Sequence, residues 1–277
     1  MNKKILTIQD LSCYGQCSLT VALPIISACG VECAVLPSAV LSTHTYNFTG
    51  YTFRDLTDDL PAIAQHWNKE GIRFDAVYTG YIGSIKQIDY IENIFKSPCA
   101  LDSYKIVDPA MGDYGKLYPG FDNDYAKAMM DLCCYAHVIV PNITEACYML
   151  GDDFEYQETY DEVYVEKLVK ELYKKTGAKV VLTGVSYSSE TTGVVVLDSG
   201  NITYYEHEKC ARSSHGTGDI YSSAFVGALM RGREIEDAAR IAADFTLACI
   251  KNTQDMPEHW YGASFESQLP KLIDALK

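Results

Sequence analysis

The sequence is poor in long apolar runs, basic clusters and targeting signals. No apolar stretch approaches the roughly 20 residues that cross a bilayer, and the start, MNKKILTIQD, lacks the apolar core of a secretory signal. Acidic side chains outnumber basic ones by 37 to 23, for a formal net charge of −14. Duplex binding needs clustered lysine and arginine, so we do not expect nucleic acid as a partner. Because apolar spans and a secretory signal are missing, we expect no membrane partner and a cytoplasmic protein.

Cysteine is present without any of the spacings that give it a structural or metal-binding role. The ten cysteines are spread over 277 residues, and none forms a C-x-x-C pair. Zinc sites use tighter knuckles with histidine partners, and disulfides are rare in the cytosol. We therefore expect buried, reduced thiols.

Several catalytic motifs are also missing. The chain has no Walker A pattern and no complete G-x-G-x-x-G after an expected strand, so standard P-loop and dinucleotide-binding proteins lose support. It has no G-x-S-x-G elbow and no H-E-x-x-H, which leaves hydrolases and zinc proteases without a nucleophile or a metal site.

What the chain has is an alternation of short β-branched runs and longer helical patterns. We expect strands at Lys4 to Gln9, Glu32 to Pro37, Phe74 to Thr79, Tyr104 to Asp108, His137 to Val140, Lys179 to Thr183, Thr192 to Leu197 and Asn201 to Glu206. We expect helices at Ser18 to Cys29, Asp55 to Glu70, Ile85 to Phe95, Asp122 to Tyr135, from about Ile143, from about Asp161 to Lys175, and at Ile220 to Met230, Ile235 to Lys251 and Glu266 to Leu276.

This rhythm is typical of βαβ units in a mostly parallel, helix-covered α/β sheet. The last two strands are separated only by Asp198-Ser199-Gly200, which predicts an antiparallel hairpin at one edge of the sheet. No linker, repeat or low-complexity tract interrupts the pattern, so we expect a single domain over residues 1–277.

Polar or glycine-rich segments follow several expected strands. They are residues 79–83, 108–113, 141–145 and 183–184, and a fifth, residues 215–219, precedes an apolar helix. In such sheets ligands bind beyond the carboxyl ends of the strands. We expect these segments to form one site.

The turn Gly216-Thr217-Gly218-Asp219 has a direct chemical use. Glycines let a ligand approach the backbone, and the free N–H groups at the following helix start favour an anion. A carboxylate at Asp219 is a suitable acceptor for the proton of a hydroxyl that attacks a phosphoryl group. An ordinary capped turn remains an alternative for this motif alone.

Carboxylates at the other strand ends point in the same direction. Asp108, Asp113 and Glu145 are suited to holding Mg²⁺ directly or through water, and Asn142 can donate to a phosphate oxygen. Asn142 with Glu145 three residues later also fits the N-cap and capping box of a helix, and both roles can coexist.

These segments, taken in order, resemble the pyridoxal (pyridoxine, pyridoxamine) kinases of the ribokinase-like superfamily. The matching residues are Ile8-Gln9, Ser42-Thr43-His44-Thr45, Thr79-Gly80-Tyr81, Asp108 to Asp113, Pro141 to Glu145 and Gly216 to Asp219. Gly-Thr-Gly-Asp marks only the superfamily, whereas Thr-Gly-Tyr with Asp-Pro-x-Met-Gly-Asp is more specific to vitamin B6 kinases. The resemblance implies a three-layer α/β/α sandwich.

It also implies ATP-dependent phosphorylation of the 5′-hydroxymethyl group of a B6 vitamer. By resemblance, Asp219 is the catalytic base and the amides of Gly216, Thr217 and Gly218 form the anion hole. The implied ATP and Mg²⁺ site comprises Asp108, Asp113, Asn142, Glu145, Thr183, Gly216 and Gly218, with Asp108, Asp113 and Glu145 around the metal. The implied vitamer site comprises Asp10, Ser12, His44, Thr45, Tyr81 and Asp219.

The resemblance further implies a flap over ATP at about residues 113–120, to which Lys116 adds a positive charge. It implies a homodimer and leaves open a monovalent cation such as K⁺. At a net charge of −14, affinity for ATP is expected to collapse without Mg²⁺.

Asp10 departs from the family, which usually has serine after Ile-Gln to bond the pyridine nitrogen. A carboxylate favours a protonated ring nitrogen, so we hypothesise that Asp10 binds it. Because of this departure, a related pyrimidine remains an alternative substrate.

Two alternatives follow. The first is a hydroxymethylpyrimidine kinase on the same fold, although those enzymes commonly carry cysteine in place of Asp219. The second is a non-catalytic protein that binds a B6 vitamer or nucleotide. Such a protein would be free to lose Asp219, Asp113 and Glu145, all of which are present.

Overall fold

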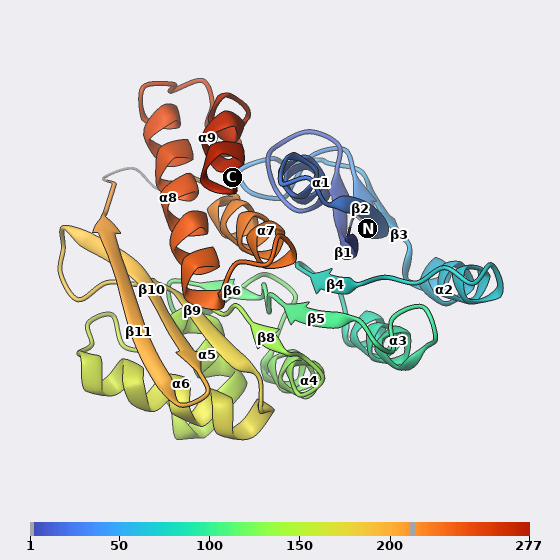
Figure 1. Cartoon of the computed structure of the whole chain (residues 1–277), viewed down its shortest axis with the longest axis horizontal. Helices are drawn as coiled ribbons and strands as arrows, with labels where there is room; N and C mark the ends of the chain where they lie inside the picture. Colours follow the sequence, from blue (N-terminus) through green and yellow to red (C-terminus); the bar gives the residue numbers. More distant parts are fainter. Residues whose placement is uncertain (1–2, 211–213) are drawn as a thin grey trace.

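The computed structural model describes residues 3–210 and 214–277 and centres on one nine-stranded sheet. The strand order is β11-β10-β9-β8-β5-β4-β1-β2-β3 (Figure 1). The pairings from β2 through β1, β4, β5 and β8 to β9 are parallel, whereas β3, β10 and β11 join antiparallel. The mostly parallel sheet and its antiparallel edge hairpin confirm the predicted fold class.

The strands are β1 (Lys4–Ser12), β2 (Glu32–Leu41), β3 (Phe53–Asp55), β4 (Ala76–Thr79), β5 (Tyr104–Val107), β6 (Gly112–Asp113), β7 (Lys116–Leu117), β8 (Val138–Ile139), β9 (Lys179–Val185), β10 (Thr191–Asp198) and β11 (Asn201–Glu208). The helices are α1 (Leu19–Ala28), α2 (Leu60–Lys69), α3 (Ile85–Lys96), α4 (Asn123–Cys133), α5 (Ile143–Leu150), α6 (Glu162–Thr176), α7 (Thr217–Met230), α8 (Ile235–Gln254) and α9 (Leu269–Ala275), with 3₁₀ turns η1 (Thr57–Asp59), η2 (Gly151–Asp153) and η3 (Glu266–Gln268). None of these helices is long and apolar enough to span a lipid bilayer.

The helices cover both faces of the sheet (Figure 1). One apolar core joins the sheet to α2, α3, α4, α5 and α6, and the other joins it to α1, α7, α8 and α9. The central strand β4 is fully buried along its length because helices lie on both of its faces. The result is the three layers that the sequence predicted.

The strand order reverses between β1 and β4. The chain moves from β1 outward to β2 and β3, then returns to the other side of β1 at β4 and continues through β5, β8 and β9. Ligands in open α/β sheets bind at such a switch point, beyond the carboxyl ends of the strands. The residues that end β1 and follow β4 are therefore placed to line a ligand site.

Several element boundaries differ from the prediction in ways that affect this site. β1 continues three residues beyond Gln9, so Asp10 and Ser12 belong to the strand. α7 begins at Thr217, so Asp219 stands in its first turn and not in the preceding loop. The sequence pattern also missed β3 and the small hairpin β6–β7, because each is only two or three residues long.

Candidate active site

The amino end of α7 is built so that a ligand can approach its backbone. Gly216, the N-cap, has φ 75°, and a Cβ there would lie 2.0 Å from the carbonyl oxygen of Gln16. A Cβ on Gly218 would meet nothing within 4 Å, so the space beside this turn is open. The first N–H groups of α7, including that of Thr217, have no carbonyl partner within the helix. The turn is therefore suited to an anion.

Asp219 projects from this turn toward the chain that leaves β1. Its Oδ2 accepts the backbone N–H of Ser18 at 2.9 Å. Burial, with a smaller contribution from the charge on Asp10, raises the pKa of Asp219 to about 7. A carboxylate that titrates near neutral pH can take a proton from an alcohol, which suits the predicted catalytic base.

Asp10 and Ser12 lie at the carboxyl end of β1. The β1–β2 register shifts between Gln9 and Leu11, and such irregularities re-aim the side chain between them. Asp10 is buried, and its Oδ2 accepts the hydroxyl of Ser12 at 2.9 Å. Burial raises the pKa of Asp10. A buried carboxylate bonded mainly to hydroxyls still favours a ligand that offers a hydrogen-bond donor.

His44 lies in the loop between β2 and β3, and both its ring nitrogens are engaged. Nδ1 accepts the N–H of Tyr46 at 3.2 Å, so the proton lies on Nε2, which donates to the carbonyl oxygen of Tyr261 at 2.8 Å. Burial lowers the pKa of His44, in keeping with this neutral form. The ring is almost wholly covered, because it also packs against Phe48 and His215 with centroids 5.0 and 4.5 Å away. Thr45, next to it, is exposed.

Aromatic side chains surround these residues. Tyr81, which follows β4, packs on Phe121 with ring centroids 5.5 Å apart, and Asp10 is among the charges that raise its pKa. His215 stacks on Tyr46 with centroids 4.8 Å apart and planes 4° apart. A flat aromatic substrate would fit against such walls.

Asp108 and Ser222 connect β5 to α7. The hydroxyl of Ser222 donates to Oδ2 of the buried Asp108 at 2.7 Å. Burial raises the pKa of Asp108, and the charge on Asp219 adds to this effect. Ser222 lies three residues after Asp219, so the two residues share one side of the helix. Sequence reasoning missed Ser222, although this spacing was the signal.

Asn142 and Glu145 form the predicted capping box at the start of α5. Asn142 Oδ1 accepts the N–H of Glu145 at 2.9 Å, and its Nδ2 donates to the carbonyl oxygen of Gly112 at 2.9 Å. Glu145 Oε2 accepts the N–H of Asn142 at 2.8 Å, and Oε1 accepts that of Met111 at 3.1 Å. Thr183, inside β9, pairs with Asn142 in an isolated bridge. The capping interpretation of this motif is correct.

Asp113 differs from the buried acids Asp108 and Glu145 in its exposure, although its charge contributes to the raised pKa of Glu145. It is exposed, and its Oδ1 accepts the N–H of Tyr114 at 2.9 Å. Asp113 pairs with Lys116 across the hairpin β6–β7. The hairpin tip is attached to α5, because the N–H of Gly115 donates to Thr144 Oγ1 at 2.9 Å. The expected flap is thus a hairpin with an anchored tip, and Thr144 is a second residue that the sequence reasoning missed.

The donor set fits a divalent cation in part. Asp108 and Glu145 are both buried, and the charge on Asp108 adds to the burial that raises the pKa of Glu145. Neither forms an ion pair with another described residue. In residues 3–210 and 214–277 no three His, Cys, Asp or Glu side chains are grouped to hold a metal ion. Mg²⁺ commonly takes one or two carboxylates and completes its shell with phosphate and water. That form of site fits these residues, and a closed protein cage does not.

Comparisons with known proteins extend over nearly the whole chain. Residues 22–263 match the family described as phosphomethylpyrimidine kinase. A protein of Bacteroides thetaiotaomicron VPI-5482, crystallised in a form with pyridoxal, is 36% identical, with a TM-score of 0.90 and coverage of 98% of this chain and 96% of that one. Pyridoxal kinase from Lactobacillus plantarum is 31% identical, with a TM-score of 0.89 and coverage of 98% and 97%. The hydroxymethylpyrimidine/phosphomethylpyrimidine kinase of Bacillus subtilis is 25% identical over 256 residues, covering 90% of this chain and 83% of its own.

Proposed function

Since this chain belongs to the phosphomethylpyrimidine kinase family, within the ribokinase-like superfamily, we propose that it phosphorylates the 5′-hydroxymethyl group of a vitamin B6 vitamer with ATP as donor. The observation that carries the proposal is Asp219, a carboxylate with a pKa near neutrality at the open amino end of α7. Similarity to pyridoxal kinases and to a protein crystallised with pyridoxal supports the vitamer as the acceptor.

In the proposed reaction Asp219 takes the proton of the vitamer hydroxyl as that oxygen attacks the γ-phosphorus of ATP. The bond between the γ-phosphorus and the β,γ-bridging oxygen breaks, and ADP leaves with the electron pair. The N–H groups of Gly216, Thr217 and Gly218 would stabilise the oxygens of the transferred group, because a helix start favours negative charge. Ser18, through its N–H bond to Asp219, would hold the base in place.

The phosphates would be bound on the other side of the same turn. Asn142, with Glu145 and Thr183, would line the nucleotide site, and Lys116 on the hairpin would add positive charge. Asp108 and Glu145 would hold Mg²⁺, which supplies charge neutralisation of the phosphates when bound. Because the protein is acidic, ATP affinity should depend strongly on this ion.

A hydroxymethylpyrimidine kinase is the second candidate, and Asp10 is the observation that favours it. Its carboxylate can accept a hydrogen bond from a protonated pyridine nitrogen or from an amino substituent on a pyrimidine. The family description and the Bacillus subtilis relative support the same candidate. The retained acid at Asp219, where the resemblance expects cysteine in those enzymes, favours the B6 vitamers.

A substrate panel tests the proposal. The purified protein is offered pyridoxal, pyridoxine, pyridoxamine and hydroxymethylpyrimidine with Mg²⁺ and ATP, and ADP release is measured with each. We expect the highest kcat/KM with a B6 vitamer. The variant Asp219→Asn should lose about 10²- to 10⁴-fold in kcat while its ATP affinity stays within twofold, as removal of a general base predicts.

Preference for hydroxymethylpyrimidine would replace the vitamer with the second candidate. Full activity of Asp219→Asn would rule out the proposed base. Tight binding of a vitamer with no turnover on any acceptor would favour the non-catalytic alternative.

A further inference from the structure

Gln87 is a buried polar side chain outside the proposed catalytic residues, with 2% of its surface exposed. It lies in the first turn of α3 and contacts four other segments of the chain. We propose that Gln87 is a positioning residue that clamps together the two walls of the vitamer pocket, the Tyr81 loop and the loop that carries His44. This inference rests on the proposed function.

The first arm of the clamp holds the Tyr81 loop. Gln87 Oε1 accepts the N–H of Gly83 at 2.8 Å. The neighbouring carbonyl of Ile82 accepts the hydroxyl of Tyr125 at 2.5 Å, and the Ile82 side chain is fully buried. The backbone just after Tyr81 is thus fixed at two successive residues. The phenol ring of Tyr81 is therefore presented to the pocket from a rigid support.

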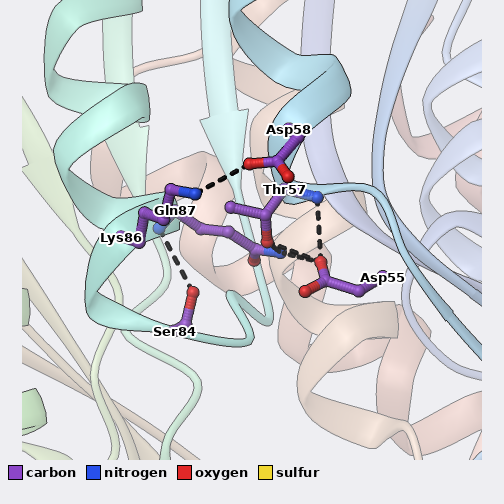
Figure 2. Close-up of polar contacts among 6 residues, drawn as sticks. All are labelled: Asp55, Thr57, Asp58, Ser84, Lys86 and Gln87. Carbon is purple, nitrogen blue, oxygen red and sulfur yellow. Dashed lines mark hydrogen bonds and ion pairs between the residues drawn. The ribbon is translucent and has the colours of Figure 1, made fainter.

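The second arm reaches the base of the β2–β3 hairpin, whose far end carries the His44 loop. Figure 2 shows its contacts with Thr57 and Asp55. Gln87 Nε2 donates to Thr57 Oγ1 at 2.8 Å and to the carbonyl oxygen of Ser38 at 3.1 Å, with a longer contact of 3.4 Å to Asp55 Oδ1. Thr57 in turn donates both its N–H, at 2.8 Å, and its hydroxyl, at 2.5 Å, to Asp55. Ser38 lies in β2 and Asp55 in β3, the strands on either side of the loop with His44.

A helix cap by itself does not account for this arrangement. Ser84 caps α3 by accepting the N–H of Gln87 at 3.3 Å, and a capping box would turn the Gln87 side chain back to the N–H of Ser84. Here the side chain instead bonds Gly83 and crosses to β2 and η1. Gln87 therefore uses both ends of its amide to join separate segments.

The clamp should act on one substrate and not the other. It holds walls that flank Asp10 at the β1 and β4 ends of the sheet, whereas the proposed nucleotide residues Asn142 and Thr183 lie at α5 and β9. β5 and β8 stand between β4 and β9 in the sheet. Loosening the clamp should therefore weaken vitamer binding and leave ATP binding intact.

The experiment measures KM for the vitamer and for ATP in three variants. Gln87→Met removes both arms at similar volume and should raise the vitamer KM about tenfold, with the ATP KM within twofold. Thr57→Val removes one acceptor of the second arm without changing side-chain shape and should raise the vitamer KM less. Hydrogen exchange should accelerate in Gln87→Met within residues 80–83 and 38–57.

Lys86→Ala is the matched control. Lys86 is the neighbour of Gln87 and, like it, joins α3 to η1, through an exposed ion pair with Asp58 at 2.7 Å (Figure 2). Exposed pairs contribute little, so this variant should keep both KM values. A fall in kcat with unchanged KM values in Gln87→Met and Thr57→Val would indicate general destabilisation and overturn the clamp.

The two proposals can fail separately. A wild-type protein that is active on a vitamer, with an unchanged vitamer KM in Gln87→Met and Thr57→Val, overturns the clamp alone. A wild-type protein that phosphorylates no acceptor overturns the proposed function. The role of Gln87 is then tested by measuring pyridoxal affinity by calorimetry. In that case equal pyridoxal affinity in the wild type and in folded Thr57→Val and Gln87→Met overturns it.

Discussion

Four carboxyl groups lie at the carboxyl end of the sheet: those of Asp10, Asp108 and Glu145 are buried, and that of Asp219 belongs to a partly exposed residue. Burial raises the pKa of each, and their mutual repulsion adds to the shift at Asp108, Glu145 and Asp219. Their partners are hydroxyl and backbone N–H groups, such as Ser12, and these stabilise a negative charge less than a cation does. Such unbalanced acids are costly to a fold, which is why perturbed pKa values indicate functional sites.

Substitutions of Asp10 test whether its carboxylate contacts the vitamer ring. If it accepts a hydrogen bond from a protonated ring nitrogen, Asp10→Ala should raise the vitamer KM about 10- to 100-fold, because bonds to charged groups contribute the most. Asp10→Ser should lose less, since a hydroxyl can still bond a neutral ring nitrogen. Titration of vitamer affinity across pH in both variants measures this.

The ATP KM is the internal control for the Asp10 variants and should not change. Unchanged vitamer affinity in both variants at every pH would show that Asp10 does not contact the ring.

At the scale of the element, the site depends on where secondary structure begins and ends. β1 presents Asp10 through an irregularity in its pairing with β2, and α7 presents Asp219 from its first turn. α5 begins with a capping box whose Glu145 also accepts the N–H of Met111 from the loop after β5. The terminal residues of these elements thus contact neighbouring strand ends. A side chain that caps a helix, such as Glu145, also helps to hold the site together.

Gly216 allows a test of the α7 start. Gly216→Ala places a Cβ 2.0 Å from the carbonyl oxygen of Gln16 and strains a residue at φ 75°, so the turn must move. Because catalysis requires groups held to within about an ångström, kcat should fall at least about tenfold. Steady-state kinetics and the thermal unfolding midpoint measure both consequences.

Gly232, after the other end of α7, is the matched control. It has φ 84°, and an added Cβ meets nothing within 4 Å, so Gly232→Ala introduces backbone strain without a clash. It should lose about 1 kcal/mol of stability and keep its kcat. Equal kcat in the two variants would show that the geometry of the Gly216 turn is not needed for turnover.

At the scale of the whole molecule, sheet order and charge act together. The reversal of strand order between β1 and β4 brings residues from distant parts of the sequence to one edge of the sheet. The protein carries a net charge of −14, so we expect anion binding to depend on helix starts and bound cations rather than on a basic surface. The unliganded protein thus combines a positive helix end with a negative interior.

The buried acids predict how stability varies with pH. Between its ordinary value of 3.8 and about 7, Asp219 keeps a proton in the folded protein that the unfolded chain has lost, and Asp108 and Glu145 behave alike. Unfolding then releases protons, so the free energy of unfolding falls as pH rises. His44 and His215 have lowered pKa values and oppose this trend only below their ordinary value of 6.5.

We therefore expect the thermal midpoint of the unliganded protein to fall from pH 6.5 to 8, as measured by differential scanning calorimetry. Asp219→Asn removes one of the titrating groups, so its midpoint should fall less steeply and lie above that of the wild type at pH 8. A wild-type midpoint that rises across this range would contradict the shifts of the buried acids.

Much of the fold could be predicted because short-range sequence patterns specify its helices and strands. The central strands and the long helices follow from apolar periodicity, and the capping box of α5 follows from Asn142 and Glu145 alone. β3 and the hairpin β6–β7 could not be predicted, because two or three residues carry no periodicity. The positions of Asp108, Asp113 and Glu145 after strands predict one metal set, but the orientations of Asp108 and Glu145 depend on contacts distant in sequence, with Ser222 and Met111.

Neighbouring residues encode the order of strands and helices, the edge hairpin and the Gly-Thr-Gly-Asp turn, so these features could be read without the fold. The packed fold was needed to show that both ring nitrogens of His44 are engaged, that Ser222 bonds Asp108 and that Gln87 bonds both Gly83 and Thr57. These contacts link residues up to 217 positions apart. Strand register and helix packing set them, and no local pattern specifies which distant groups will meet.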